Sequence, residues 1–185
     1  MRLYHWNALI SASFLFPLHV FEICLRNAAA NAIESYYNPL WPWANAFEMS
    51  LPSNPRPHFS PRHEIRSARV RHTTTGKIIA DIKFAFWVSI FTSRHDGRLW
   101  SPCLRREFPN IPATVTIANA RLKIHDVADR VRELRNRIAH HEPIFQRNLA
   151  TDYALIKDIV GYRCAHTAAW MDRAQSVTAL AATCP

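Results

Sequence analysis

A seven-residue repeat of apolar side chains between residues 114 and 143 constrains the fold more than any other feature. The repeat consists of Ile117, Ile124, Val131 and Ile138, with Ala120, Val127 and Leu134 at the intermediate positions. This spacing returns each side chain to one side of an α-helix, so it predicts a long helix whose apolar seam faces another helix. Pro143 marks the end of the pattern, because proline cannot continue a helix.

The rest of the chain has the pattern of a helical protein. Its 185 residues include only three glycines, 49% are hydrophobic, and valine and isoleucine do not alternate as they do in strands. We therefore predict an all-α, bundle-like fold of four or five helices in a single domain over residues 1–185. The four cysteines form no CxxC pair and no zinc-ligand spacing, which predicts a reducing compartment and no metal or other cofactor.

Apolar spacing, caps and prolines predict the other segments. A first helix should cover about 6–37, with a kink or break at Pro17, followed by a proline-rich loop to residue 61. Ser60 and Pro61 resemble the cap and first residue of a helix that ends near residue 72. The predicted remainder is a break at 73–76, an apolar helix at 77–92, irregular chain at 93–112, and a last helix at 151–182 that Gly161 could interrupt.

The chain is strongly basic, with 23 Lys and Arg against 14 Asp and Glu and a formal charge of +9. Such a surface favours a polyanion, either nucleic acid or an anionic membrane. Arg62, Arg66 and Arg69, with Arg56 and Arg71 nearby, are candidates for an RNA-backbone track, or alternatively form an ordinary solvated basic face.

The N-terminus has a faint signal-peptide pattern, because residues 8–16 are apolar. The apolar pattern runs on without a small-residue cleavage site, and Glu22 and Arg26 interrupt it before a membrane span of about 20 residues is complete. We expect a soluble, cytoplasmic protein with no membrane partner.

The end of the long helix contains the strongest candidate chemistry. Arg135, Asn136, His140 and His141 precede Pro143 within about two helical turns. An arginine can stabilise charge on a phosphate, and a histidine can move protons near neutral pH. Together these groups could cut RNA without a metal, using the ribose 2′-hydroxyl as the nucleophile. In the plain alternative, they are basic residues favoured by the negative end of the helix dipole.

Helical geometry limits how these residues can meet. Asn136 and His140 are four residues apart and share a face, so the amide could orient the ring. Arg135 lies about 140° around the helix from His140. The two can meet through the long arginine side chain, through a distorted last turn, or across a second subunit. His141 falls on the extension of the apolar seam, which predicts a packed or interface histidine.

Three segments together resemble the Abi-like branch of the HEPN superfamily, whose members are associated with abortive phage infection. Arg135 and Asn136 followed by His140 match the R-x4-H signature of that superfamily. Residues 21–27 (FEICLRN) resemble its N-terminal E-x3-R-N helix, and residues 84–87 (FAFW), with Leu99 and Trp100 downstream, resemble its central aromatic segment.

The resemblance implies an all-α HEPN fold and a homodimer in which two Arg–His pairs form one composite, metal-independent endoribonuclease site. In that case Arg135 and His140 are catalytic, Asn136 orients the site, and Glu22, Arg26 and His141 support it. Arg137 joins Arg62, Arg66 and Arg69 as a predicted RNA contact. Relatives silenced by adenylylation have a tyrosine where this chain has Glu142, so a nucleotidyltransferase antitoxin is not expected.

The predicted function is therefore an endoribonuclease in antiviral defence or a toxin, leaving 2′,3′-cyclic phosphate ends on RNA. A non-catalytic RNA-binding protein of the same fold, including a degenerate member that no longer cuts, is the first alternative. A helical dimer whose basic face docks a protein or a membrane is another. The RNA target and any antitoxin or RNA partner are not specified by the sequence.

Overall fold

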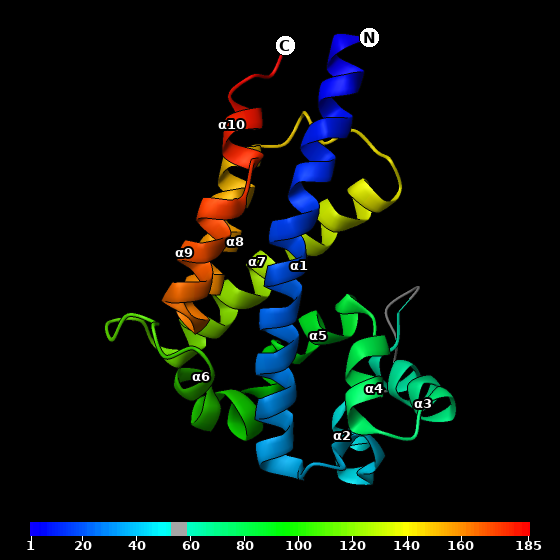
Figure 1. Cartoon of the computed structure of the whole chain (residues 1–185). Coiled ribbons are helices and arrows are strands. Elements are labelled where there is room, and N and C mark those ends of the chain that lie inside the picture. The colour runs from blue at the N-terminus through cyan, green and yellow to red at the C-terminus, as the bar shows by residue number, and fades with distance from the viewer. Residues whose placement is uncertain (53–58) are drawn as a thin grey trace. The chain divides into compact units, whose positions relative to one another are not determined.

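The structure is a computed structural model that describes residues 1–52 and 59–185. Within these residues the chain is all-helical, with no β-strand, which confirms the predicted class. It divides into two compact units, each assembled from separate stretches of chain. Unit 1 contains residues 1–24, 108–115 and 126–185, and unit 2 contains residues 25–107 and 116–125. Helices α1 (Arg2–Tyr37) and α7 (Ile117–Ala139) each continue from one unit into the other (Figure 1). The single domain predicted from the length of the chain stays a prediction.

Unit 1 is built from the first part of α1, the last part of α7, and three further helices. These are α8 (Leu149–Arg163), α9 (Ala165–Ala174) and α10 (Val177–Ala181). Its core includes Ile10 and Phe14 of α1, Val131 and Leu134 of α7, and Ile156 of α8, all almost fully buried. The two ends of the chain are also in contact, because the indole Nε1 of Trp6 donates a 2.9 Å hydrogen bond to the Leu180 carbonyl. The middle of the α7 seam is therefore buried: Val127, Val131 and Leu134 in this unit, and Ala120 and Ile124 in unit 2. Ile117 and Ile138, at the two ends of the seam, are half-buried.

Unit 2 is made of short helices around an aromatic core. In chain order they are η1 (Trp41–Trp43), α2 (Asn45–Ser50), α3 (Pro61–Arg71), α4 (Thr75–Asp81), α5 (Phe84–Ile90), η2 (Ser93–His95), the π-helix η3 (Asp96–Trp100) and α6 (Ser101–Glu107). Trp41 and Trp87 are fully buried, with ring centroids 6.3 Å apart. The two rings pack edge to face, which buries a large apolar area and joins η1 to α5.

The first helix ends at Tyr37 as predicted, but it begins at Arg2 and not near residue 6. Pro17 lies inside this continuous helix, so the break considered there is wrong. The Ser60 hydroxyl accepts a hydrogen bond from the His63 N–H at 3.3 Å, which confirms the cap of α3.

Other segments differ from the prediction. The loop expected up to residue 61 contains η1 and α2, and the irregular stretch after residue 92 contains η2, η3 and α6. The helix predicted at 77–92 is two helices, and the last helix is three, with its first break at Cys164 and not at Gly161. The described residues therefore contain ten α-helices rather than four or five.

Helix α1 is long and apolar enough to cross a membrane by length and composition, with a window of mean hydropathy 1.8 that is 39% buried in the structure. Core helices of soluble proteins and N-terminal signal sequences share this composition. Glu22 and Arg26 therefore do not by themselves exclude a membrane span, and the cytoplasmic location stays a prediction.

Candidate active site

Helix α7 ends in a motif that exposes the predicted catalytic residues. The His140 N–H still donates to the Asn136 carbonyl at 2.9 Å, as in a regular helix. His141 then adopts a left-handed conformation with φ 57°, and the Glu142 N–H donates back to the Arg137 carbonyl at 2.8 Å. Together with a 3.2 Å hydrogen bond from the His141 N–H to the Ile138 carbonyl, this forms a Schellman cap. The helix therefore stays regular through His140 and turns sharply after it.

The position of His141 corrects one expectation. As the left-handed residue beyond the helix, it leaves the line of the apolar seam, and its side chain is exposed. The prediction that His141 packs along the seam of its own chain is therefore wrong, because the left-handed turn at the end of α7 directs this residue away from the seam. A left-handed conformation is costly for a residue other than glycine and persists where surrounding contacts enforce it.

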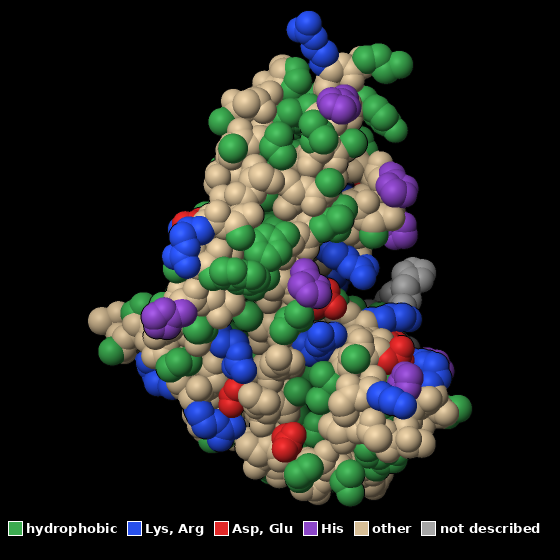
Figure 2. All heavy atoms as spheres, viewed as in Figure 1, with side chains coloured by type: hydrophobic (Ala, Val, Ile, Leu, Met, Phe, Trp, Pro, Cys, Tyr) green, Lys and Arg blue, Asp and Glu red, His purple; other side chains and the backbone are tan. Residues whose placement is uncertain are grey.

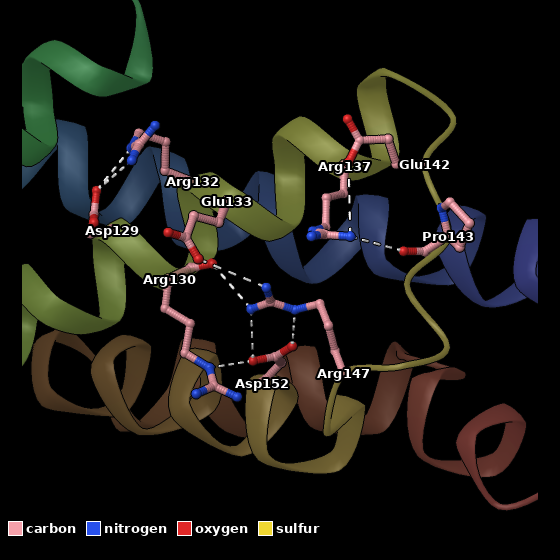
Figure 3. Close-up of polar contacts among 9 residues, drawn as sticks. All are labelled: Asp129, Arg130, Arg132, Glu133, Arg137, Glu142, Pro143, Arg147 and Asp152. Carbon is pink, nitrogen blue, oxygen red and sulfur yellow. Dashed lines mark hydrogen bonds and ion pairs between the residues drawn. The ribbon is translucent and has the colours of Figure 1, made fainter.

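The loop after His140 is fixed at both ends by polar contacts. The Asn7 side-chain oxygen accepts a 2.9 Å hydrogen bond from the Ile144 N–H, and the Ile144 side chain is fully buried. Arg137 donates to the Pro143 carbonyl at 3.3 Å and lies 3.8 Å from the Glu142 carboxylate (Figure 3). Both contacts hold the chain that follows His140 in one direction, so the end of α7 is preorganised.

A buried carboxylate holds the next part of the loop. Asp152, at the start of α8, has a side chain only 2% exposed and binds both Arg130 and Arg147. Arg147 also donates to the Arg130 carbonyl at 3.4 Å and approaches Glu133 at 3.9 Å (Figure 3). Buried carboxylates need such partners, because an unpaired charge is costly to bury. This clamp joins the loop to α7 and α8.

Arg135 differs from the other arginines in the second half of α7. Arg130 is paired with Asp152, Arg132 with Asp129 at 2.8 Å, and Arg137 with Glu142. Arg135 is exposed and, among the described residues, has no hydrogen bond or ion pair from its side chain. Its guanidinium keeps its full set of donors for an outside anion, and phosphate is the anion it matches in geometry.

Asn136 and His140 lie on the open face of α7, opposite the buried seam. His140 is exposed and Asn136 is half-buried. Within the part of the chain that the structure describes, no side-chain hydrogen bond or ion pair joins Arg135, Asn136 and His140 to one another. The helix is regular here, so the separation of about 140° between Arg135 and His140 remains. One copy of the chain therefore exposes Arg135 and His140 but does not bring the two side chains together.

The two supporting residues on α1 do not form the salt bridge that their spacing allows. Glu22 and Arg26 are both half-buried, and the Arg26 Nε is buried without a hydrogen-bond partner among the described residues. The i,i+4 pair considered for them is therefore not formed. Their supporting role stays a prediction.

The three arginines predicted on the α3 face hold unit 2 together instead of lying free. Arg66 and Arg69 both bind the buried carboxylate of Glu48, and Arg62 donates to the Leu51 carbonyl at 2.7 Å. Burial alone would raise the pKa of Glu48, but the hydrogen bonds and charges of Arg69 and Arg66 hold it below its ordinary value. Binding phosphate would require these arginines to give up internal partners. Arg56 lies outside the described residues.

Sequence reasoning missed the groups that fix the site, namely Asn7, Arg147 and Asp152. Asn148 caps α8 by accepting from the Thr151 N–H at 3.0 Å, and an acidic residue in the next turn favours a helix start, so Asp152 had a local signal. Asn7 had none, because its partner is 137 residues away. Trp41 is fully buried and so cannot stack on an RNA base, while Trp43 is 37% exposed.

Across residues 1–52 and 59–185, no three His, Cys, Asp or Glu side chains are grouped so that they could hold a metal ion. Comparison of the chain with protein-family models, curated proteins and solved structures gives no match, so the likeness to the HEPN superfamily rests on the three segments of this sequence alone.

Proposed function

We propose that the protein is a metal-independent endoribonuclease whose site contains Arg135, Asn136 and His140. The observation that carries the proposal is Arg135, which is exposed and has no ion-pair partner among the described residues. It lies five residues before His140, in a helix whose neighbouring arginines are each paired with a carboxylate. Among the described residues, Arg130, Arg132 and Arg137 have acidic partners and Arg135 has none, so its guanidinium can bind an anionic ligand.

In the proposed reaction, one histidine removes the proton from the ribose 2′-hydroxyl, which attacks the adjacent phosphate. Arg135 stabilises the negative charge that builds on the phosphorane. A second proton-carrying group protonates the departing 5′ oxygen. The products are a 2′,3′-cyclic phosphate and a 5′-hydroxyl. Such chemistry suits a toxin or a defence protein, because it needs no cofactor.

We infer that two copies complete the site. Arg135 and His140 diverge on one regular helix, so a second copy can supply the missing partner to each. An exposed apolar face on unit 1 supports such pairing. Leu9 and Leu15 of α1 are 44% and 57% exposed, and Trp170 of α9 is 51% exposed against Phe16. Figure 2 shows hydrophobic side chains gathered where α1 and α9 lie side by side.

Asn7, which binds the loop after His140, lies two residues before Leu9 on α1. Side chains two residues apart lie on opposite sides of a helix, so Leu9 points away from the side of α1 that holds this loop. The middle of the α7 seam is already buried in one copy, and only Ile117 and Ile138 at its ends are half-buried, so we assign the face of α1 and α9 to a second copy.

The test is cleavage of cellular and transfer RNA by pure protein in EDTA, with the product ends assayed for cyclic phosphate. Arg135→Ala should abolish cleavage. Arg132→Ala is the matched control, because Arg132 lies one turn earlier on α7 and is paired with Asp129. Intact RNA with wild-type protein, or equal rates for the two variants, would reject the proposal. RNA binding without cleavage would favour the non-catalytic alternative.

A further inference from the structure

Two of the four cysteines belong to the same part of unit 1, although 140 residues separate them in the sequence. Cys24 is on α1, and Cys164 is the turn residue between α8 and α9. Both are half-buried free thiols. The other two differ in their surroundings, because Cys103 is buried in unit 2 beside the Ser35 hydroxyl and Cys184 is exposed near the C-terminus.

Two contacts fix how α1 runs past the C-terminal helices of unit 1. Trp6 of α1 donates to the Leu180 carbonyl of α10 at 2.9 Å. Ten residues farther along α1, the ring of Phe16 lies 5.2 Å from the ring of Trp170 in α9. Because Trp170 precedes Leu180 by ten residues as well, α1 and the segment from α9 to α10 run antiparallel and stay in step (Figure 1).

This pairing brings Cys24 to the level of Cys164. Cys24 comes eight residues after Phe16, and Cys164 comes six residues before Trp170. The two cysteines are therefore offset by only two residues, or about 3 Å along a helix axis.

The direction of the Cys24 side chain also fits. Cys24 follows Trp6 by 18 residues on one continuous helix, which is about five full turns, so both side chains leave α1 on the same side. On that side Trp6 contacts α10. Cys24 therefore faces the C-terminal helices, where Cys164 joins α8 to α9.

The electrostatics of the two thiols agree with this placement. Burial raises the pKa of the Cys24 thiol, the charge of Arg163 opposes the rise, and the charge of Cys164 adds to it. Hydrogen bonding by Thr167 lowers the pKa of the Cys164 thiol, and the charge of Arg163 contributes in the same direction. Cys164 is therefore the thiol that more readily becomes a thiolate, which is the reactive form.

We propose that Cys164 and Cys24 form a reversible disulfide when a peroxide reaches unit 1. With hydrogen peroxide, the Cys164 thiolate attacks one oxygen and the O–O bond breaks, which leaves a sulfenic acid on Cys164 and releases one water. The Cys24 sulfur then attacks the sulfenic sulfur, the S–O bond breaks, and the leaving hydroxide takes the Cys24 proton to form a second water. Two thiols lose two electrons, and one peroxide gains them.

The disulfide fastens α1 to the corner between α8 and α9. It closes a loop of 140 residues, and a cross-link over a long loop restricts the unfolded chain strongly. It also joins the two helices that carry the exposed Leu9, Leu15 and Trp170. A reversible bond is compatible with the predicted reducing compartment, where disulfides act as transient sensors. The disulfide rests on the placement of two thiols and not on the proposed nuclease.

The test maps disulfides in the full-length chain with Cys184→Ser, which removes the exposed thiol that could link separate molecules. The reduced protein is treated with hydrogen peroxide, its remaining thiols are blocked with N-ethylmaleimide, and its tryptic peptides are weighed without reduction. Trypsin places the other cysteines on separate peptides, 3–26, 99–105 and 164–173. We expect 3–26 linked to 164–173, and dithiothreitol should release the two.

The matched variants are Cys103→Ser, which should keep the link, and Cys164→Ser, which should lose it. Absence of the link between 3–26 and 164–173, or an equal yield of links to 99–105, would overturn the proposal. The order of the two steps has its own test. In Cys24→Ser the sulfenic acid has no partner, so dimedone should label Cys164, whereas Cys24 of Cys164→Ser should stay unlabelled. Equal labelling of the two would overturn Cys164 as the attacking thiol.

Urea titration checks that the bond forms in the native fold. The oxidised protein should unfold at a urea concentration at least about 1 M higher than the reduced protein, because the cross-link limits the unfolded chain. A midpoint below that of the reduced protein would show that the thiols meet only when the fold is distorted, and would overturn the proposal. The result is separable from that of the nuclease, because none of these readouts uses RNA.

Discussion

The side-chain oxygen of Asn7 accepts a 2.9 Å hydrogen bond from the main-chain N–H of Ile144, across 137 residues of sequence. This contact ties the first turns of α1 to the loop that leaves His140. It helps to fix the loop after His140, although Asn7 has no chemical role in the proposed reaction.

Asn7→Ala should therefore loosen the loop. The Ile144 N–H would lose its acceptor, and we expect a loss of about 1 kcal/mol in the free energy of unfolding, measured by urea titration. The Ile144 amide should also exchange its hydrogen faster. Asn7→Asp is the control, because a carboxylate can accept the same bond. If Ala and Asp behave alike, the hydrogen bond does not hold the loop.

Replacing the left-handed His141 by glycine should stabilise the protein. Glycine adopts φ 57° without the steric cost that histidine carries, although it is freer when unfolded, so we expect a net gain of roughly 0.5–1 kcal/mol. RNA cleavage should persist, since His140 and not His141 is assigned the proton transfer. Loss of cleavage with unchanged fold would transfer that role to His141.

Acid should weaken unit 2 through His95. Its side chain is 1% exposed, and burial, helped by the nearby charges of Arg94 and Arg98, lowers its pKa to about 4. The unfolded chain therefore binds more protons than the folded one between about pH 6.5 and pH 4, so stability falls as pH falls through that range. The full effect is about 3 kcal/mol.

Urea titrations at several pH values would measure this loss. In His95→Leu the slope of stability against pH should flatten between pH 6.5 and pH 4, whatever the absolute stability of the variant. An unchanged slope would show that His95 is not the group responsible.

Removal of Arg69 should damage the fold more than RNA binding. Glu48 would keep Arg66 but lose its less exposed partner, and breaking a buried pair of this kind costs about 3 kcal/mol. Arg69→Met should therefore lower the urea midpoint while leaving RNA affinity within about twofold of wild type in native buffer. A folded variant with strongly weakened RNA binding would restore the α3 face as the RNA track.

Long, regular helices could be predicted from the sequence. Helix boundaries that depend on contacts between residues far apart in the sequence could not. The repeat between residues 114 and 143 identified α7 because its buried residues follow the helical period. The predicted helix at 77–92 is interrupted because the Lys83 N–H donates to Glu64, at 3.3 Å, rather than continuing a helix. Similarly, Asp96 of the unpredicted π-helix is held by Arg121, 25 residues away.

The candidate site shows the same division. The types and spacing of Arg135, Asn136 and His140 are visible in the sequence, and so is their divergence around the helix. The sequence could not show that Arg135 lacks an ion-pair partner among the described residues. This depends on which arginines pair with Asp152, Asp129 and Glu142 in the folded chain. The sequence also favoured Arg62, Arg66 and Arg69 because they are clustered, although clustering does not show whether a charge is already paired.

We propose that Arg135 of one copy acts with His140 of another. This pairing is tested by the rate of RNA cleavage in EDTA by wild type, by Arg135→Ala, by His140→Ala, and by the two variants co-expressed. We predict that wild type cuts, that each variant alone does not, and that the mixed preparation regains part of the rate, because one pair is complete across the two copies. Wild type that leaves RNA intact, or a mixture as inactive as its components, would contradict the claim.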